Sequence, residues 1–378
     1  MYCAPVMAPA AAPLLGVAPA AVGYFVTAAY LGSMIGTATA GGWVQRFGPI
    51  RVSQIGMLLC GCGLAIAASG TLPAVLAGAL LIGLGYGPAT PASSVILARA
   101  APSGMLALTF SIKQTGVPLG TAIAGAVVPL LVLGLGWQAA ALLIGATCAL
   151  FGLVIAPLRA QYDRERNRAA PVSLRSAFAP VLLVLREPKI MQLAATSFVY
   201  GGVQITLVAY LVAFLTESFG LSLVLAGIVM AVSQLSSVAG RVLWGVVADH
   251  VLSRRATLGM LGVGMGITAL CAVGAGPHWP LWTLFAFAIA LGVTAVGWNG
   301  VFLAELTRLA PQGRIGDVTG GSSFFTFLGV VVTPPLFYLV LGLTSSYGAT
   351  YALFGIPPFA VGMLLLWTSR MARKESKS

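Results

Sequence analysis

The stretch GGWVQRFGPIR, Gly41 to Arg51, lies between two apolar segments and sets the pattern for the rest of the chain. The flanking segments, residues 22–44 and 52–70, are long enough to cross a bilayer, since a spanning helix needs about 20 mostly apolar residues. Nine more such segments follow, separated by short loops: 74–98, 105–134, 138–158, 190–216, 222–248, 256–274, 280–304, 320–342 and 347–369. The sequence therefore predicts eleven membrane-spanning helices.

The opening stretch, residues 1–16, is a candidate for a twelfth helix. No basic residue precedes its apolar run, so it is not typical of a signal peptide. Prolines at positions 5, 9 and 13 would bend any helix there. We interpret this stretch as the second half of a first helix whose start is missing or wrongly assigned, and the sequence leaves open whether the true start lies upstream of Met1.

Composition alone places the chain in a membrane. Of its 378 residues, 59% are hydrophobic and only 7% are charged, whereas an ordinary soluble domain carries about 25% charged residues. So few charges could not cover a surface that faces water, which excludes a soluble enzyme, a secreted disulfide scaffold and a disordered regulator. We expect an all-α membrane protein embedded in a lipid bilayer.

The basic residues predict the orientation of the chain. There are 20 Lys and Arg against 8 Asp and Glu. If the loop 45–51 is cytoplasmic and the sides alternate, 18 of the 20 basic residues lie in cytoplasmic segments and none lies on the opposite side, as the positive-inside rule requires. The C-terminus is then cytoplasmic. Because the basic residues are spread over every inner loop, they do not indicate nucleic-acid binding.

No metal or cofactor site is expected. The five cysteines lie in apolar runs without CxxC spacing, which favours buried free thiols. His250 and His278 fall in loops on opposite sides of the predicted membrane, so they cannot pair. No GxxxxGK[ST] loop for nucleotide phosphates is present.

The longest polar stretch divides the chain. Residues 159–189 are charged and predicted to be cytoplasmic, so we expect a linker between an N-terminal six-helix bundle, 1–158, and a C-terminal one, 190–378. The two halves also repeat: when 23–51 is set against 227–255, six of 29 positions are identical, three of them glycines. Duplicated halves are typical of secondary transporters.

The stretch from Gly41 to Arg51 is similar to a signature of the major facilitator superfamily that lies between the second and third helices. This signature is a Gly, then Asp-Arg-x-Gly, then basic residues. The matching residues are Gly41, Arg46, Gly48 and Arg51. Gln45 stands where the family has Asp, so we expect the charge pairing of this gating loop to be weaker in the first half. The corresponding loop of the second half, GVVADHVLSRR, keeps Gly245, Asp249 and Arg254.

This resemblance covers the chain apart from its missing start. The segment TGVPLGTAIAG in the predicted fifth helix looks like the glycine-proline motif of the family, through Gly116, Pro118 and Gly120. The resemblance implies a twelve-helix fold with two pseudo-symmetric bundles that rock about a central site, in a bacterial-type plasma membrane. It also implies a transporter rather than an enzyme, and a monomer.

Two basic residues inside predicted helices point to the substrate. Lys113 and Arg241 both lie roughly 10–12 Å from the cytoplasmic boundary at 1.5 Å per residue, and no acidic residue is expected at that depth. Such residues cost about 2.5–3.5 kcal/mol to insert, so they normally face a cavity or a partner. The resemblance places their helices side by side. We therefore expect a small anionic substrate, and a carboxylate fits because arginine can grip one with two hydrogen bonds.

The motif GRVLWG, Gly240 to Gly245, adds to this expectation. An arginine four residues before the glycine resembles the pattern of monocarboxylate and oxalate–formate carriers, in which it binds the substrate carboxylate. Ser237 stands where monocarboxylate carriers have an acid, so the sequence leaves open a coupling proton or a counter-anion.

Other interpretations remain open at this level. Arg241 could cap helix carbonyls, Lys113 could extend to the inner surface, and the function could be multidrug efflux or, with less support, that of a receptor. Several polar residues within the predicted helices could hydrogen-bond a ligand or a neighbouring helix: Tyr30, Gln114, Tyr200, Gln204, Gln234 and Asn299.

Overall fold

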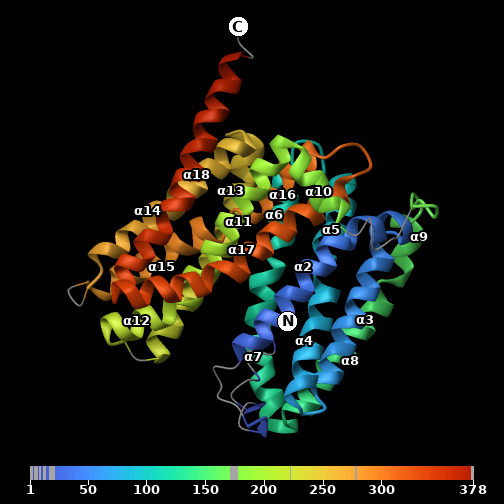
Figure 1. Ribbon diagram of the computed structural model, residues 1–378, viewed down its shortest axis with the longest axis horizontal. Helices are drawn as coiled ribbons and strands as arrows, with labels where there is room; N and C mark the ends of the chain where they lie inside the picture. Colours follow the sequence, from blue (N-terminus) through green and yellow to red (C-terminus); the bar gives the residue numbers. More distant parts are fainter. Residues whose placement is uncertain are drawn as a thin grey trace. The chain divides into compact units, whose positions relative to one another are not determined.

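The computed structural model describes residues 22–170, 178–221, 223–276 and 279–375, together with residues 3, 7, 10–11 and 14–16. The regular structure in these ranges is helical (Figure 1). Ten segments within them are long and apolar enough to cross a membrane, and they coincide with ten of the eleven predicted spans. This is a multi-pass membrane protein. The predicted twelfth helix, in the stretch 1–16, lies largely outside the described residues.

The remaining predicted span, 22–44, forms one helix of 26 residues, α2 (Val22–Phe47). It falls outside the ten because its glycines and threonines lower its hydropathy. The other helices, in chain order, are α3 (Pro49–Ala67), α4 (Leu72–Tyr86), α5 (Ala89–Ala100), α6 (Leu106–Gln114), α7 (Gly116–Leu135), α8 (Trp137–Val154), η2 (Ala156–Leu158), α9 (Arg159–Tyr162), α10 (Ala179–Arg186), α11 (Pro188–Ala209), α12 (Leu211–Phe219), α13 (Leu223–His250), α14 (Arg254–Cys271), η4 (Ala272–Gly274), α15 (Leu281–Ala295), α16 (Asn299–Leu309), α17 (Ile315–Thr344) and α18 (Tyr347–Glu375).

Several predicted spans consist of two helices with a short interruption. The pairs are α4 with α5, α6 with α7, α11 with α12, and α15 with α16. Proline explains two of these breaks, because it has no N–H and its ring clashes with the carbonyl four residues earlier. Pro88 follows α4, and Pro118 sits in the first turn of α7, so the carbonyl of Gln114 at the end of α6 loses its helical donor.

The chain forms two compact units. Unit 1 contains residues Met1–Ala100, Leu119–Met191 and Leu309–Phe327, and unit 2 contains Ala101–Pro118, Gln192–Arg308 and Leu328–Ser378. The division predicted from the sequence, 1–158, 159–189 and 190–378, stays a prediction. In the structure, residues 101–118 of the predicted N-terminal bundle belong to unit 2, and residues 309–327 of the predicted C-terminal bundle belong to unit 1.

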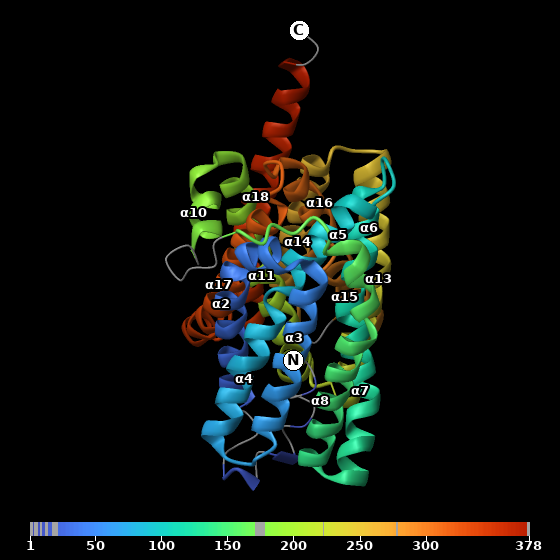
Figure 2. The ribbon, with the colours of Figure 1, turned by 90° about the vertical axis from the view of Figure 1, so that its right-hand side faces the viewer.

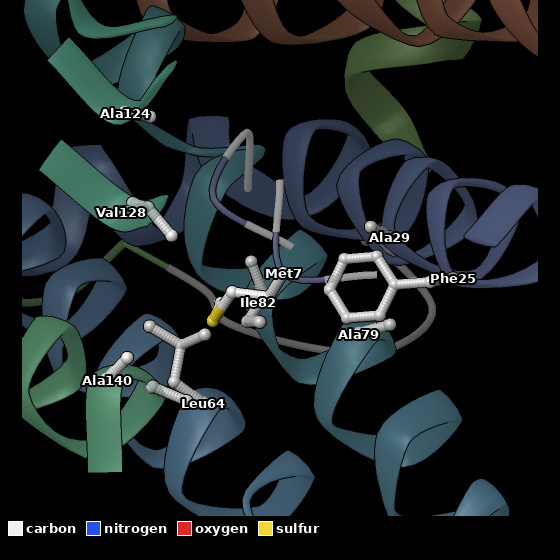
Figure 3. Close-up of a cluster of buried hydrophobic side chains, with 10 residues drawn as sticks. Met7, Phe25, Ala29, Leu64, Ala79, Ile82, Ala124, Val128 and Ala140 are labelled. Carbon is white, nitrogen blue, oxygen red and sulfur yellow. The ribbon is translucent and has the colours of Figure 1, made fainter. Parts of the chain in front are cut away.

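Unit 1 is organised around α3, which packs against both α4 and α8 (Figures 1 and 2). A hydrophobic core joins five helices: Phe25 and Ala29 of α2, Leu64 of α3, Ala79 and Ile82 of α4, Ala124 and Val128 of α7, and Ala140 of α8 (Figure 3). Met7 from the start of the chain lies among these side chains and is buried with them.

Unit 2 is organised around two helix pairs. α14 packs along α18, and α13 packs against both α15 and α6. Aromatic rings fill part of its interior, where Phe214 stacks on Tyr351 with a centroid distance of 4.9 Å and Tyr351 meets Phe337 edge-on at 5.5 Å.

Glycines allow close contact between helix backbones in both units. In unit 1, a Cβ added to Gly83 would lie 2.0 Å from the carbonyl oxygen of Ala29. In unit 2, a Cβ added to Gly292 would lie 2.0 Å from the carbonyl oxygen of Ser233, and Ser233 is 204 residues after Ala29. The two carbonyls at these contacts are thus related by the offset of the sequence repeat, whereas the two glycines are 209 residues apart, so the duplication stays a prediction.

Candidate functional site

The two intramembrane cations lie in the same unit. Lys113 is in the last turn of α6 and Arg241 is in α13, and these helices pack together within unit 2, as the resemblance implies. The contact is close because a Cβ on Gly245 of α13 would lie 2.9 Å from the Cα of Leu108 in α6. The two charges are within electrostatic range of each other.

Arg241 is held by the broken ends of two helices. Its Nε donates to the carbonyl of Val296 at 3.0 Å, and its Nη1 donates to the carbonyl of Gln114. Gln114 ends α6 and Val296 follows the last residue of α15, so both carbonyls lie where the helical ladder stops. Arg241 is only 3% exposed, and the negative ends of two helix dipoles lie beside its guanidinium. This geometry corresponds to the capping role that the sequence left open.

Lys113 has a different environment. Its side chain is half-buried, and its Nζ donates to Oε1 of Gln114 at 3.0 Å. Within the described ranges no carboxylate forms an ion pair with it. Gln114 therefore connects the two cations, through its side chain to Lys113 and through its backbone to Arg241.

A second polar group lies at the break between α15 and α16. Oε1 of Gln204 accepts from Nε1 of Trp298 at 2.9 Å and from Nδ2 of Asn299 at 3.2 Å. Because Asn299 is three residues from Val296, extended-chain geometry keeps their Cα atoms within about 11 Å. Arg241 thus fixes the end of α15, while Gln204 fixes the start of α16.

The remaining candidates are placed as follows. Tyr200 is fully buried, donates to the carbonyl of Leu258 at 3.0 Å and meets the ring of Trp298 edge-on. Gln234 is half-buried on α13, two turns before Arg241 and so on the same face. Tyr30 lies in unit 1, buried against Phe327 with a centroid distance of 5.7 Å, so the structure does not place it with the others.

The gating loop of the second half is built on Asp249. Its carboxylate accepts from the backbone N–H groups of Ala107 at 3.1 Å and Leu108 at 2.8 Å, and so caps the N-terminus of α6. Arg254 completes the arrangement with an ion pair to Asp249 at 3.1 Å. A residue in the last turn of α13 therefore caps the start of the helix that carries Lys113.

The first half has its carboxylate on a different helix. Nε2 of Gln45 donates at 3.0 Å to Asp317, which lies in the first turn of α17 and also pairs with Arg314 at 2.8 Å. A Cβ on Gly41 would overlap Asp317, so this position has room only for glycine. The acid that is absent at position 45 is therefore supplied from the facing helix, which the sequence comparison of the two loops could not indicate.

A further carboxylate that the sequence analysis missed organises the same loop. Asp163 is buried and accepts from the N–H groups of Ile50 at 2.9 Å and Arg51 at 3.2 Å, which caps α3. Gly48 turns toward it with φ at 94°. Asp163 lies more than 100 residues along the chain from this turn, and nothing in the local sequence links the two.

Comparison with known proteins agrees with this architecture. A model described as Major Facilitator Superfamily matches residues 1–334. An uncharacterized MFS-type transporter of Mycobacterium tuberculosis (strain CDC 1551 / Oshkosh) is 26% identical over 283 residues, covering 74% of this chain and 61% of the relative, so the match spans less than two thirds of that protein. A gallate transporter of Pseudomonas putida is 26% identical, covering 93% of this chain and 84% of the relative.

Among solved structures, the human organic anion transporter MFSD10 (TETRAN) superimposes with a TM-score of 0.75. The match covers 91% of this chain and 83% of that chain at 17% sequence identity, which establishes similarity of fold.

Proposed function

Because this chain belongs to the major facilitator superfamily, we propose that it is a secondary transporter that moves a small organic anion by alternating access. A carboxylate is the anion that the basic groups suit best. The proposed setting is the plasma membrane of a bacterium, because these two relatives are bacterial proteins, and the proposed coupling partner is a proton or a counter-anion.

The observation that carries this proposal is the position of Lys113. A half-buried ammonium about seven residues into a membrane span is costly unless something compensates its charge. Its bond to a neutral glutamine leaves that charge in place. A carboxylate bound there would neutralise it and would reduce its repulsion with Arg241.

Arg241 has a supporting role in this proposal. Its two carbonyl bonds hold α6 and α15 in register, so its guanidinium is fixed when a substrate arrives. Gln114 and the amide groups of Gln204, Gln234 and Asn299 would complete the ligand set by hydrogen bonding. Tyr200 would support this set from behind, since its hydroxyl is occupied by Leu258.

The relatives are consistent with an organic anion. Gallate, named for the Pseudomonas putida relative, carries a carboxylate, and the solved structure with the same fold is named as an organic anion transporter.

The test is uptake of radiolabelled mono- and dicarboxylates, including gallate, into proteoliposomes. We expect Lys113→Gln to lower the initial rate of carboxylate uptake about tenfold or more, because the positive charge at the proposed site is lost. Lys113→Arg should retain part of this rate, because arginine is also cationic. Lys189→Gln is the matched control, since Lys189 is exposed at the start of α11. A carboxylate flux that is equal in the wild type and Lys113→Gln would refute the site, and transport of cationic drugs alone would refute the anion.

A further inference from the structure

Four arginines of unit 1 line one surface pocket that the transport proposal does not use. The pocket has a volume of about 370 Å³, within the range typical of small-molecule sites, and is lined by Arg46, Phe47, Arg51, Arg166 and Arg168. Arg46 is in the last turn of α2 and Arg51 is in the first turn of α3, while Arg166 and Arg168 come from the segment after α9. Figure 1 shows α9 beside the start of α3.

The segment that carries Arg166 and Arg168 is fixed in place. The Asp163 carboxylate caps α3, the N–H of Asn167 donates to the carbonyl of Gln45 at 2.8 Å, and Nη1 of Arg46 donates to the carbonyl of Ala170 at 3.4 Å. These bonds bring charges from distant parts of the chain together before any ligand binds. A pre-organised site loses less conformational entropy on binding.

The nearby acids are occupied elsewhere. Asp163 caps α3 and lies 4.0 Å from Arg159, and Glu165 pairs with Arg99 at 3.0 Å. Within the part of the chain that the structure describes, no ion pair includes Arg46, Arg51, Arg166 or Arg168. Four like charges in one pocket repel one another, so a polyvalent or strongly acidic oxygen anion is the complementary ligand.

The position of the pocket relative to the ends of the membrane spans indicates the source of this anion. Its arginines flank the start of one membrane span, at Pro49, and the end of another, at Tyr162, so they lie where headgroups meet water. Trp43, which is 41% exposed, stacks on Phe47 at 5.3 Å, and tryptophan is enriched at this interface. The basic-residue pattern makes this the cytoplasmic side, whose leaflet is rich in anionic lipids.

We propose that the pocket of Arg46, Arg51, Arg166 and Arg168 binds the phosphate of an anionic phospholipid headgroup. Arginine recognises phosphate oxygens bidentately, and Phe47, 5.7 Å from the guanidinium of Arg46, fixes one wall. The bound lipid would tie the loop between α2 and α3 to the linker. This site shares no residue with the proposed substrate site, so either assignment can fail alone.

The test is native mass spectrometry of the purified full chain with dioleoyl-phosphatidylglycerol or dioleoyl-phosphatidylcholine. We expect phosphatidylglycerol to be retained selectively. The double variant Arg166→Gln/Arg168→Gln should weaken its binding about 30-fold, from about 1 kcal/mol per basic side chain near an anionic surface. Arg166→Lys/Arg168→Lys should retain most of it, and an unchanged melting temperature shows that the variants are folded.

The matched control is Arg186→Gln/Lys189→Gln, which removes two exposed charges that do not line the pocket and should leave binding unchanged. Equal loss in this control would overturn the proposal in favour of a diffuse charge effect. Equal retention of both lipids, or equal binding in Arg166→Gln/Arg168→Gln, would also overturn it. Inorganic phosphate that binds without lipid at the same arginines and displaces phosphatidylglycerol fully would assign the site to a soluble phosphate instead.

Discussion

Single side chains hold distant segments together in this protein. Asp163 caps α3 from the far end of the first half, Asp249 caps α6 from the end of α13, and Arg241 binds the carbonyls at two helix breaks. Each of these charges meets backbone groups that a helix end leaves without partners. Helix ends in a membrane protein need such partners because lipid cannot supply them.

Replacement of Gly48 by Ala tests the turn at Asp163. Alanine at φ 94° costs about 1–2 kcal/mol, and its Cβ would lie 2.4 Å from Cγ of Asp163 and displace the cap of α3, for about 1 kcal/mol more. Gly104→Ala is the matched control, because Gly104 also has a positive φ, at 77°, but nothing lies within 4 Å of its Cβ position. Thermal unfolding in detergent should show the larger loss for Gly48→Ala, and equal losses would contradict the clash.

Replacement of Asp249 by Ala tests the cap of α6. The side chain is fully buried, so its removal leaves two backbone N–H groups and Arg254 without their partner, and we expect a loss of about 2–4 kcal/mol in unfolding free energy. Glu165→Ala removes an acid from an exposed pair and should cost less than about 1 kcal/mol. Denaturant unfolding followed by tryptophan fluorescence measures both, and a loss no greater than that of Glu165→Ala would rule out a capping role.

At the scale of elements, glycine decides which helix faces pack. Gly61 of α3 and Gly145 of α8 face each other, as do Gly266 of α14 and Gly355 of α18, each against the carbonyl of the other. Small residues let helices approach closely where lipid offers no hydrophobic driving force for their association. One glycine pair of the internal repeat makes such contacts in both units: a Cβ on Gly36 would lie 2.7 Å from the carbonyl oxygen of Leu84, and one on Gly240 would lie 2.9 Å from the Cα of Val293.

Replacement of Gly292 by Ala tests this packing. The new Cβ would lie 2.0 Å from the carbonyl oxygen of Ser233, so α13 and α15 must separate, at a cost of about 1–3 kcal/mol. Gly227→Ala is the control: it changes an exposed site on α13 with open space, where the better helix propensity of alanine gives a neutral effect or a gain up to about 1 kcal/mol. The apparent melting temperature distinguishes the two, and a neutral Gly292→Ala would show that the helices are not in backbone contact.

At the scale of the whole molecule, the distribution of charge predicts the orientation in the membrane. The segments predicted to be cytoplasmic carry 18 of the 20 basic residues, and the turns between them on the other side carry none. This orientation stays a prediction from the sequence.

Site-directed labelling tests this orientation. In a background without native cysteines, Ser69→Cys and Ser346→Cys, both at exposed turns, should react with a membrane-impermeant maleimide in intact cells. Ser103→Cys and Gln312→Cys, equally exposed, should react only after permeabilisation. The reverse pattern would invert the topology, and labelling of all four in intact cells would contradict the alternation of spans.

The sequence by itself determined the spans, because hydropathy and segment length are local properties on which insertion into a bilayer directly depends. The orientation, the duplication and the depth of Lys113 and Arg241 in the membrane stay predictions from the sequence. The fold of the major facilitator superfamily followed from the loop Gly41 to Arg51 and its counterpart at Gly245. Only the tertiary structure decided which partners these residues have. Asp163, Asp317 and the carbonyl of Val296 reach their partners across 55 or more residues of chain, and such pairings arise from helix packing, which no local pattern encodes.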